Sequence, residues 1–254
     1  MRYRVIQWAT GNVGRAAVRG IVAHRELTLV GAWVHDRAKA GRDVGELCGL
    51  GPLGVTATAA VDEILALPAD CVLYAPQLAD TDMVIRLLAA GKNVVTPVGW
   101  FYPTFDPRRD ELEAACRAGG SSLHGTGIHP GGITERFPLT LSALCTNIRH
   151  IRAEEFSDIR NYAAPFVVRE IMQFGKPPAA AMASPMVILL GQGFNQSIDM
   201  IAATLGWTLD AEKPAQHEVA VATRTIDTPV GPIEAGTVAA QRFTWQGTVG
   251  GRPV

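Results

Sequence analysis

The stretch that decides the fold is residues 4–14, which read RVIQWATGNVG. It begins with an apolar run, passes into a glycine-containing turn, and is followed by residues with helical spacing as far as residue 23. A strand, a tight turn and a helix in this order are typical of the start of a doubly wound α/β domain. We therefore expect a strand at residues 4–8 and a helix at residues 12–23.

The turn is a variant of the G-x-G-x-x-G dinucleotide fingerprint, with Ala9 in place of the first glycine. Gly11 would let the backbone approach a pyrophosphate, and Gly14 would let the helix pack close to the strand. The N–H groups at the start of the helix would then meet the phosphates. The predicted cofactor contacts of this turn are Ala9, Thr10, Gly11, Asn12, Val13 and Gly14. The alternative is that the two glycines only shape a tight turn.

Asp36 lies 22 residues after Gly14, at the end of a second predicted strand at residues 27–34. An acidic residue at this place binds the adenosine ribose hydroxyls and favours NAD, because a carboxylate repels a 2′-phosphate. Arg37 is adjacent, and either Arg37 or Arg15 could neutralise that phosphate. We expect NADP or NAD as cofactor, with a slight preference for NADP. Asp36 and Arg37 as solvated surface charges remain the alternative.

Strands and helices continue to alternate up to residue 125. The further strands are predicted at residues 71–75, 93–96 and 121–124, and the further helices at 80–90 and 107–118. Strands that are separated by helices form a parallel sheet with both faces covered. We therefore predict an α/β, Rossmann-type doubly wound domain over residues 1–130.

The pattern changes after Gly125, where a loop rich in glycine and proline leads into a second domain at residues 131–254. The elements expected there are helices at 133–145 and 162–174, a longer helix after residue 185, a strand at 148–156 and antiparallel strands within 218–248. These elements predict an α+β domain with a mixed or antiparallel sheet. The chain stops five residues after a segment typical of a central strand. We expect either an exposed or covered last strand or a shortened C-terminus.

Composition excludes several classes of protein. The net charge is −1, so there is no electrostatic case for nucleic acid or a membrane surface as partner. No stretch reaches the roughly 18 apolar residues that a membrane span needs, and the start of the chain has no secretory signal. The four cysteines form no C-x-x-C pair, so we expect no metal site, no disulfide framework and a reducing cytoplasm.

The reaction site is expected at the carboxyl ends of the strands, where ligands bind to doubly wound sheets. This places Ala75, Pro76 and Thr96 beside the cofactor, together with the segment 96–102 and the loop 125–132. These residues are the remaining candidates for contacts near the nicotinamide.

His129 and Tyr102 are the candidate catalytic residues. The imidazole of His129 can donate a proton or anchor a substrate near neutral pH, and the hydroxyl of Tyr102 can also donate. The alternatives are a loop histidine that bonds to backbone and an aromatic segment, 100–102, that lines an apolar pocket. Glu135 is expected in the first turn of the next helix, where the helix dipole favours a carboxylate.

Several motifs resemble the dihydrodipicolinate reductase-like superfamily. They are residues 7–15 (QWATGNVGR), 35–37 (HDR) and 43–47 (DVGEL). Residues 125–131 (GTGIHPG) are similar to the T-G-x-N-P-G loop of the 2,4-diaminopentanoate dehydrogenase and native amine dehydrogenase branch, with His129 at the asparagine position. Residues 197–202 and 205–207 are similar to the C-terminal domain of that branch.

The resemblance implies NAD(P)-dependent hydride transfer at an amine or imine carbon of a small substrate. It also implies that the second domain forms a homodimer or a higher homo-oligomer. The chain departs from the family in two places. The His-His-x-x-Lys-x-Asp-Ala-Pro-Ser-Gly stretch of the true reductases is absent, so we do not expect their activity. Residues 97–103 contain no acidic residue, although the amine dehydrogenases carry one after the corresponding strand.

The second departure leaves the substrate open. The carbon that accepts or donates the hydride could belong to a C=N or CH–NH group or to a C=O group, as in an aldehyde or a sugar. A non-catalytic NAD(P)-binding sensor or a degenerate enzyme of the same fold is the alternative of a different class.

Overall fold

The structure is a computed structural model that describes residues 2–254. It divides into two compact units, Met1–Gly132 and Ile133–Val254. Each unit has its own core and is described separately below.

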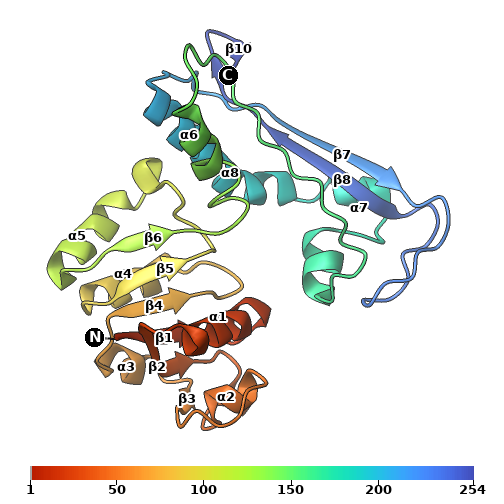
Figure 1. Ribbon diagram of the computed structural model, residues 1–254. Coiled ribbons are helices and arrows are strands. Elements are labelled where there is room, and N and C mark those ends of the chain that lie inside the picture. The colour runs from red at the N-terminus through yellow and green to blue at the C-terminus, as the bar shows by residue number, and fades with distance from the viewer. Residues whose placement is uncertain (1) are drawn as a thin grey trace. The chain divides into compact units, whose positions relative to one another are not determined.

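The first unit is built on a six-stranded parallel sheet with the order β3-β2-β1-β4-β5-β6 (Figure 1). The strands are β1 (Tyr3–Trp8), β2 (Leu27–Trp33), β3 (Ala57–Thr58), β4 (Cys71–Tyr74), β5 (Asn93–Thr96) and β6 (Leu123–Gly125). The order reverses between β1 and β4, which is the point where doubly wound sheets bind their ligands. The prediction of a Rossmann-type sheet is therefore confirmed.

Helices connect the strands of the first unit. They are α1 (Asn12–Ala23), α2 (Val44–Leu47), α3 (Val61–Ala66), α4 (Thr81–Ala89) and α5 (Arg109–Gly119). The Asp80 side chain accepts a hydrogen bond from the Met83 N–H and so caps the start of α4. Gly120 ends α5 in the left-handed conformation, with φ at 60°.

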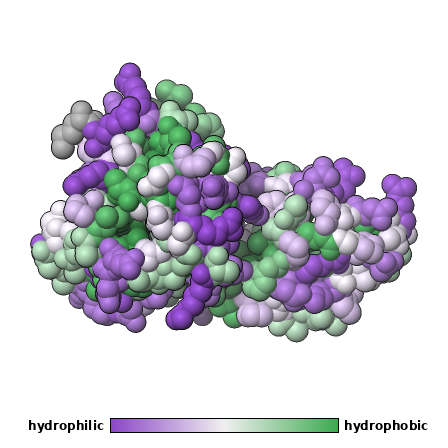
Figure 2. Space-filling model, turned by 90° about the horizontal axis from the view of Figure 1, so that it is seen from below, coloured by the Kyte–Doolittle hydropathy of each residue, from purple (hydrophilic) through white to green (hydrophobic). Residues whose placement is uncertain are grey.

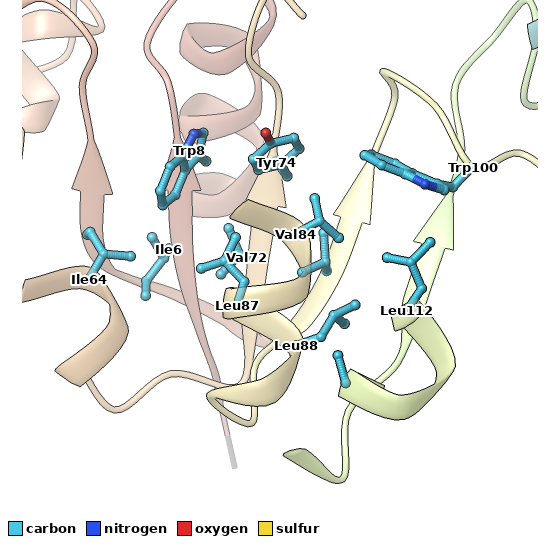
Figure 3. Close-up of a cluster of buried hydrophobic side chains, with 12 residues drawn as sticks. Ile6, Trp8, Ile64, Val72, Tyr74, Val84, Leu87, Leu88, Trp100 and Leu112 are labelled. Carbon is cyan, nitrogen blue, oxygen red and sulfur yellow. The ribbon is translucent and has the colours of Figure 1, made fainter. Parts of the chain in front are cut away.

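Two apolar clusters cover the two faces of the sheet. Neighbouring side chains of a strand point to opposite faces, so Val5 joins the cluster under α1 and α2, while Ile6 joins the cluster under α3, α4 and α5. Figure 3 shows the second of these clusters, with Trp8 and Tyr74 beside each other above Ile6. Because both faces are covered, the strands are continuous apolar runs rather than alternating ones.

The second unit combines helices with two small antiparallel sheets (Figure 1). Its helices are α6 (Arg136–Ser142), α7 (Pro178–Met182), α8 (Met186–Leu205) and a π-helical turn, η3 (Phe166–Ile171). The strands are β7 (Ala215–Val221) with β8 (Val238–Trp245), and β9 (Thr248–Val249) with β10 (Arg252–Pro253). A stack of aromatic rings joins α8 to the β7–β8 sheet, and the ring centroids of Phe194 and Trp245 lie 4.4 Å apart within it.

Two predictions for the second unit are wrong. The segment 148–156 forms neither strand nor helix, and Phe156 at its end is 90% exposed. Its apolar residues find no partner strand, so there is no ladder to hold it extended. The helix predicted at residues 162–174 is only the six-residue π-helical turn η3, which starts after Pro165 and is followed by Gln173 in the left-handed region.

Neither the face in Figure 2 nor the described helices show a long apolar stretch. Hydrophilic and hydrophobic residues are interspersed on the face shown in Figure 2. Among residues 2–254, no helix is both long and apolar enough to cross a bilayer.

Candidate functional site

The β1–α1 turn has the geometry of a phosphate-binding loop with a strained first position. Ala9 has φ at 70°, in the left-handed region that an alanine enters at a cost of about 1–2 kcal/mol. The chain thus adopts at Ala9 the conformation for which the fingerprint normally uses glycine. The expectation that Ala9 stands in for the first glycine agrees with this backbone conformation.

Gly11 and Gly14 are required for different reasons. A Cβ atom on Gly14 would lie 2.1 Å from the carbonyl oxygen of Ala9, so no side chain fits between α1 and the turn. A Cβ atom on Gly11 would meet nothing within 4 Å, and its φ of −72° suits any residue. Gly14 therefore serves the fold, whereas Gly11 keeps open the space in front of α1.

The N-terminus of α1 is available to an anion. No side chain caps it, and Gly11 at the N-cap is exposed. The first N–H groups of a helix have no partner within the helix, and they carry the positive end of its dipole. Together with the open space at Gly11, this arrangement fits the pyrophosphate of a dinucleotide.

A carboxylate and two cationic side chains follow shortly after β2. Asp36 caps a short 3-10 turn, η1 (Arg37–Lys39), and its Oδ1 accepts from the Ala38 N–H at 2.9 Å. Arg37 and Lys39 lie within the same turn. The loop after β2 therefore carries a carboxylate and cations close together in the chain.

Aromatic rings form a rigid floor at the ends of the central strands. Trp8 stacks on Trp33 with 4.4 Å between the ring centroids, and Tyr74 lies 5.7 Å from Trp8. Burial raises the pKa of Tyr74 to about 12, so its phenol stays neutral. Ala75 and Pro76 follow directly after β4, and both are partly exposed at this edge.

The end of β5 is folded tightly against the end of β6. Thr96 is fully buried, and its hydroxyl accepts a hydrogen bond from the Val98 N–H at 3.1 Å. A Cβ atom on Gly125 would lie 2.1 Å from the carbonyl oxygen of Trp100, which itself has φ at 56°. Thr96 therefore shapes this edge of the sheet with its side chain turned inward.

The aromatic segment after β5 is divided in its roles. Trp100 is 5% exposed and belongs to the cluster under α5, where Figure 3 shows it above Leu112. Phe101 is also buried, whereas Tyr102 is partly exposed. The interpretation of this segment as a pocket wall is wrong for Trp100, because its ring fills the core beneath the sheet edge.

His129 lies in a loop that folds back on itself. The His129–Pro130 peptide bond is cis, and Gly127 and Gly131 have φ at 151° and 118°. A Cβ atom on Gly131 would lie 2.4 Å from the Gly127 nitrogen, so the two arms of the loop touch. His129 is half-buried within this compact loop. Sequence alone places His129 and Tyr102 on the same edge of the sheet, and the structure adds this constrained backbone.

Glu135 has a different role from the one expected of it. It is fully buried at the N-cap of α6, but its side chain does not cap that helix. Its Oε2 instead accepts from the hydroxyls of Thr134 at 2.5 Å and Ser197 at 2.9 Å. Ser197 comes from α8, so the carboxylate ties two helices of the second unit together. Local sequence patterns carry no signal for a contact across 62 residues.

Residues 2–254 contain no group of three or more His, Cys, Asp or Glu side chains that could hold an ion. Cys48, Cys71, Cys116 and Cys145 are free thiols.

Comparisons with known proteins cover nearly the whole chain. Residues 5–96 match the family model of the N-terminus of dihydrodipicolinate reductase, and residues 133–254 match that of the 2,4-diaminopentanoate dehydrogenase C-terminal domain. An amine dehydrogenase from Streptomyces virginiae is 38% identical over an alignment of 266 positions, which spans 98% of this chain and 72% of that protein. A 2,4-diaminopentanoate dehydrogenase from Acetoanaerobium sticklandii is 27% identical over 147 residues, 56% of this chain and 40% of that protein.

Solved structures agree on the fold. The amine dehydrogenase from Mycobacterium smegmatis has a TM-score of 0.76 at 21% identity, over 97% of this chain and 75% of that one. A biliverdin reductase from Synechocystis, solved with biliverdin and NADP+, has a TM-score of 0.52 at 19% identity, over 99% of this chain and 70% of that one.

The fold is that of a Rossmann-type protein, and the 38% identity to an amine dehydrogenase over nearly the whole chain makes it an oxidoreductase. The chain belongs to the dihydrodipicolinate reductase-like superfamily, in the branch of the amine dehydrogenases and the 2,4-diaminopentanoate dehydrogenases. The resemblance found in the turn, in the Asp43 motif and in the C-terminal motifs is thereby confirmed.

Proposed function

We propose that this protein is an NAD(P)-dependent oxidoreductase that moves a hydride to or from the carbon of a C=N or CH–NH group of a small substrate. The observation that carries the proposal is the uncapped N-terminus of α1, with the open space at Gly11, at the topological switch point. The match to an amine dehydrogenase over 98% of the chain supports the choice of bond.

The residues of the turn fit a dinucleotide. The backbone from Ala9 to Gly14 would hold the pyrophosphate, and Asp36 or Arg37 would contact the second ribose or its phosphate. Ala75 and Pro76 would border the nicotinamide, whereas Thr96, whose side chain is buried, would shape that edge of the sheet from within. When bound, the nicotinamide supplies or accepts the hydride. The chain's own part is to orient that ring, to exclude water and to hold a proton near the reacting atoms.

NADP is the preferred cofactor in this proposal. Arg37, Arg15 and Lys39 are positive, and none of the three forms an ion pair with a carboxylate in the described structure. Arg15 is held instead by the amide oxygen of Asn12, at 2.7 Å. The Oδ1 atom of Asp36 is already bonded to the backbone at Ala38, so Asp36 contributes less to ribose binding than an unengaged carboxylate.

Proton transfer is assigned to His129, with Tyr102 as a second candidate. His129 sits in the constrained loop after β6, and Tyr102 follows β5, so both belong to the edge where the substrate would meet the cofactor. Tyr74 is excluded from this role because its neutral phenol is buried and its oxygen accepts from the Asp80 N–H at 3.2 Å.

The test is a titration followed by a reaction panel. Trp8 and Trp33 lie at the site, so binding of NADPH and NADH can be followed by quenching of tryptophan emission. Turnover is then followed by nicotinamide absorbance with cyclic imines, ketones with ammonia, and aldehydes. Reduction of an imine is the expected result. Failure to bind either nucleotide refutes the proposal.

A non-catalytic NAD(P)-binding sensor is the second candidate. The observation that favours it is that residues 97–103 contain no acidic side chain. Tight binding of NADPH together with no turnover across the whole panel would support the sensor. Turnover of aldehydes alone would show that the reacting bond is C=O and not C=N.

We also propose a cytoplasmic homodimer that forms through the second unit. Large apolar side chains are exposed on and after α6, with Phe137 at 62%, Leu141 at 46% and Leu144 at 84%. Exposed apolar groups of this kind mark contact surfaces. Light scattering after size exclusion would show a mass of one chain if the proposal is wrong.

A further inference from the structure

Gln7 is a fully buried amide within an apolar strand. Its side chain is 0% exposed, and Val5, Ile6 and Trp8 beside it in β1 are buried as well. Its Nε2 atom donates to two consecutive backbone carbonyls, that of Trp8 at 3.0 Å and that of Ala9 at 3.0 Å. The amide therefore links the end of strand β1 to the first residue of the turn through two hydrogen bonds.

The orientation of this amide is fixed by its neighbours. Both atoms in front of Nε2 are carbonyl oxygens, so a flipped amide would set three acceptors against one another. In the observed orientation Oε1 has no hydrogen-bond partner among residues 2–254. A buried acceptor without a partner is destabilising, and an apolar residue in the strand would avoid that penalty.

The turn that Gln7 holds is strained and tightly packed. Ala9 has φ at 70°, which an alanine disfavours. The carbonyl oxygen of Ala9 lies 2.1 Å from the position that a Cβ atom of Gly14 would take, so it is turned inward against α1. A carbonyl that faced the phosphate instead would repel it. The inward direction thus leaves the N–H groups of the turn to the anion.

We infer that Gln7 is a positioning residue for cofactor binding. It acts through the backbone: its amide holds the carbonyls of Trp8 and Ala9 inward and keeps Ala9 in the left-handed conformation that the phosphate-binding turn requires. This inference rests on the proposed binding of NADPH or NADH, and it adds a residue whose side chain touches neither the nucleotide nor the substrate.

A double-mutant cycle between Gln7 and Ala9 tests the inference. Gln7→Met keeps the length of the side chain and removes both donors. Ala9→Gly lets the backbone adopt φ at 70° without support. The control is Val72→Ala in the neighbouring strand β4, which empties part of the cluster on the opposite face of the sheet and does not touch the turn. Dissociation constants for NADPH and NADH are measured by tryptophan quenching, and unfolding temperatures by circular dichroism.

Gln7→Met is expected to weaken nucleotide binding by about tenfold or more, which corresponds to a loss of roughly 1.4 kcal/mol in the free energy of binding. Ala9→Gly alone should stay within about threefold of the original affinity, and the double variant should regain most of the loss. Val72→Ala should lower the unfolding temperature and leave the affinity unchanged.

Three results would overturn the inference. The first is an unchanged affinity in Gln7→Met. The second is an equal loss of nucleotide affinity on Gln7→Met whether position 9 is alanine or glycine, which would show that Gln7 acts on general stability and not through Ala9. The third is a Gln7→Met protein that does not fold and is not restored by Ala9→Gly. Absence of nucleotide binding in the original protein refutes the proposed function itself, so the two failures are distinguishable.

Discussion

Replacement of Gly14 by alanine probes the closest approach in the nucleotide-binding turn. The new Cβ atom would lie 2.1 Å from the carbonyl oxygen of Ala9 and 2.9 Å from its carbonyl carbon. Optimal contacts between heavy atoms are about 3.5–4.0 Å, so α1 and the turn would have to separate by more than an ångström. The obstacle is backbone and cannot rotate away, as the end of a flexible side chain could.

The magnitude follows from two opposing terms. Overpacking of a core costs about 1–3 kcal/mol, and a rigid backbone neighbour places this site at the upper end. Alanine within a helix recovers about 1 kcal/mol relative to glycine. The net loss in the free energy of unfolding is therefore about 2 kcal/mol, or roughly 4–8 °C in the unfolding midpoint at 2–4 °C per kcal/mol.

Gly20 offers a matched control on the same helix. It is exposed, and a Cβ atom there would meet nothing within 4 Å. Gly20→Ala should therefore gain about 1 kcal/mol from helix propensity alone. Urea unfolding of both variants, followed by circular dichroism without nucleotide, should separate them by about 3 kcal/mol. A difference below about 0.5 kcal/mol would show that α1 and the turn do not approach this closely in solution.

Three further outcomes are expected. Gly11→Ala should unfold at the same temperature as the original protein but bind NADPH about tenfold more weakly or worse, since the methyl group would enter the space that a phosphate needs. Hydrogen bonds from Arg4 lower the pKa of Asp70 to about 2, below its ordinary value of 3.8, so the stability from this pair is complete above pH 4 and is lost as the pH falls towards 2. Urea titrations from pH 2 to 6 should show a shallower loss in Asp70→Asn, and an unchanged slope would refute the pairing. Arg169→Met leaves three backbone carbonyls without a donor and should accelerate hydrogen exchange in the second unit only; equal acceleration in the first unit would contradict this.

The first unit was predictable from sequence because its signals are local. The predicted bounds of α1 and β5 agree with the structure, since a glycine turn fixes the start of α1 and Pro97 follows the end of β5. Each strand there is a short apolar run between breakers, and a covered parallel sheet requires little else. The sequence motif predicts an open approach for a pyrophosphate at Gly11 and close helix packing at Gly14. The space around each glycine is consistent with these two roles.

The second unit was predicted less well because its contacts are distant in sequence. Residues 148–156 have the apolar spacing of a strand, but a strand also requires a neighbour, and no spacing along one segment reveals one. Glu135 is expected to interact with the dipole at the start of its own helix, yet it bonds to Ser197 on another helix. The role of Gln7 could not be predicted from sequence for a third reason. A polar residue in an apolar strand usually faces solvent, whereas this one turns back onto its own backbone.

The two halves of the site place different demands on the chain. In the proposed site the cofactor is bound by backbone N–H groups, so any residue that keeps the turn open and rigid can occupy it. Glycine adopts the left-handed conformation at position 9 without support, whereas Ala9 would adopt it with the help of the hydrogen bond from Gln7. Proton transfer uses a specific side chain, and here residues 97–103 differ from the acidic pattern of the amine dehydrogenases. In the proposed reaction this departure would concern the handling of the proton and not that of the hydride. Since one scaffold hosts many reactions by changing the few side chains at the ends of its strands, we expect the choice of substrate to depend on this segment and on the loop around His129.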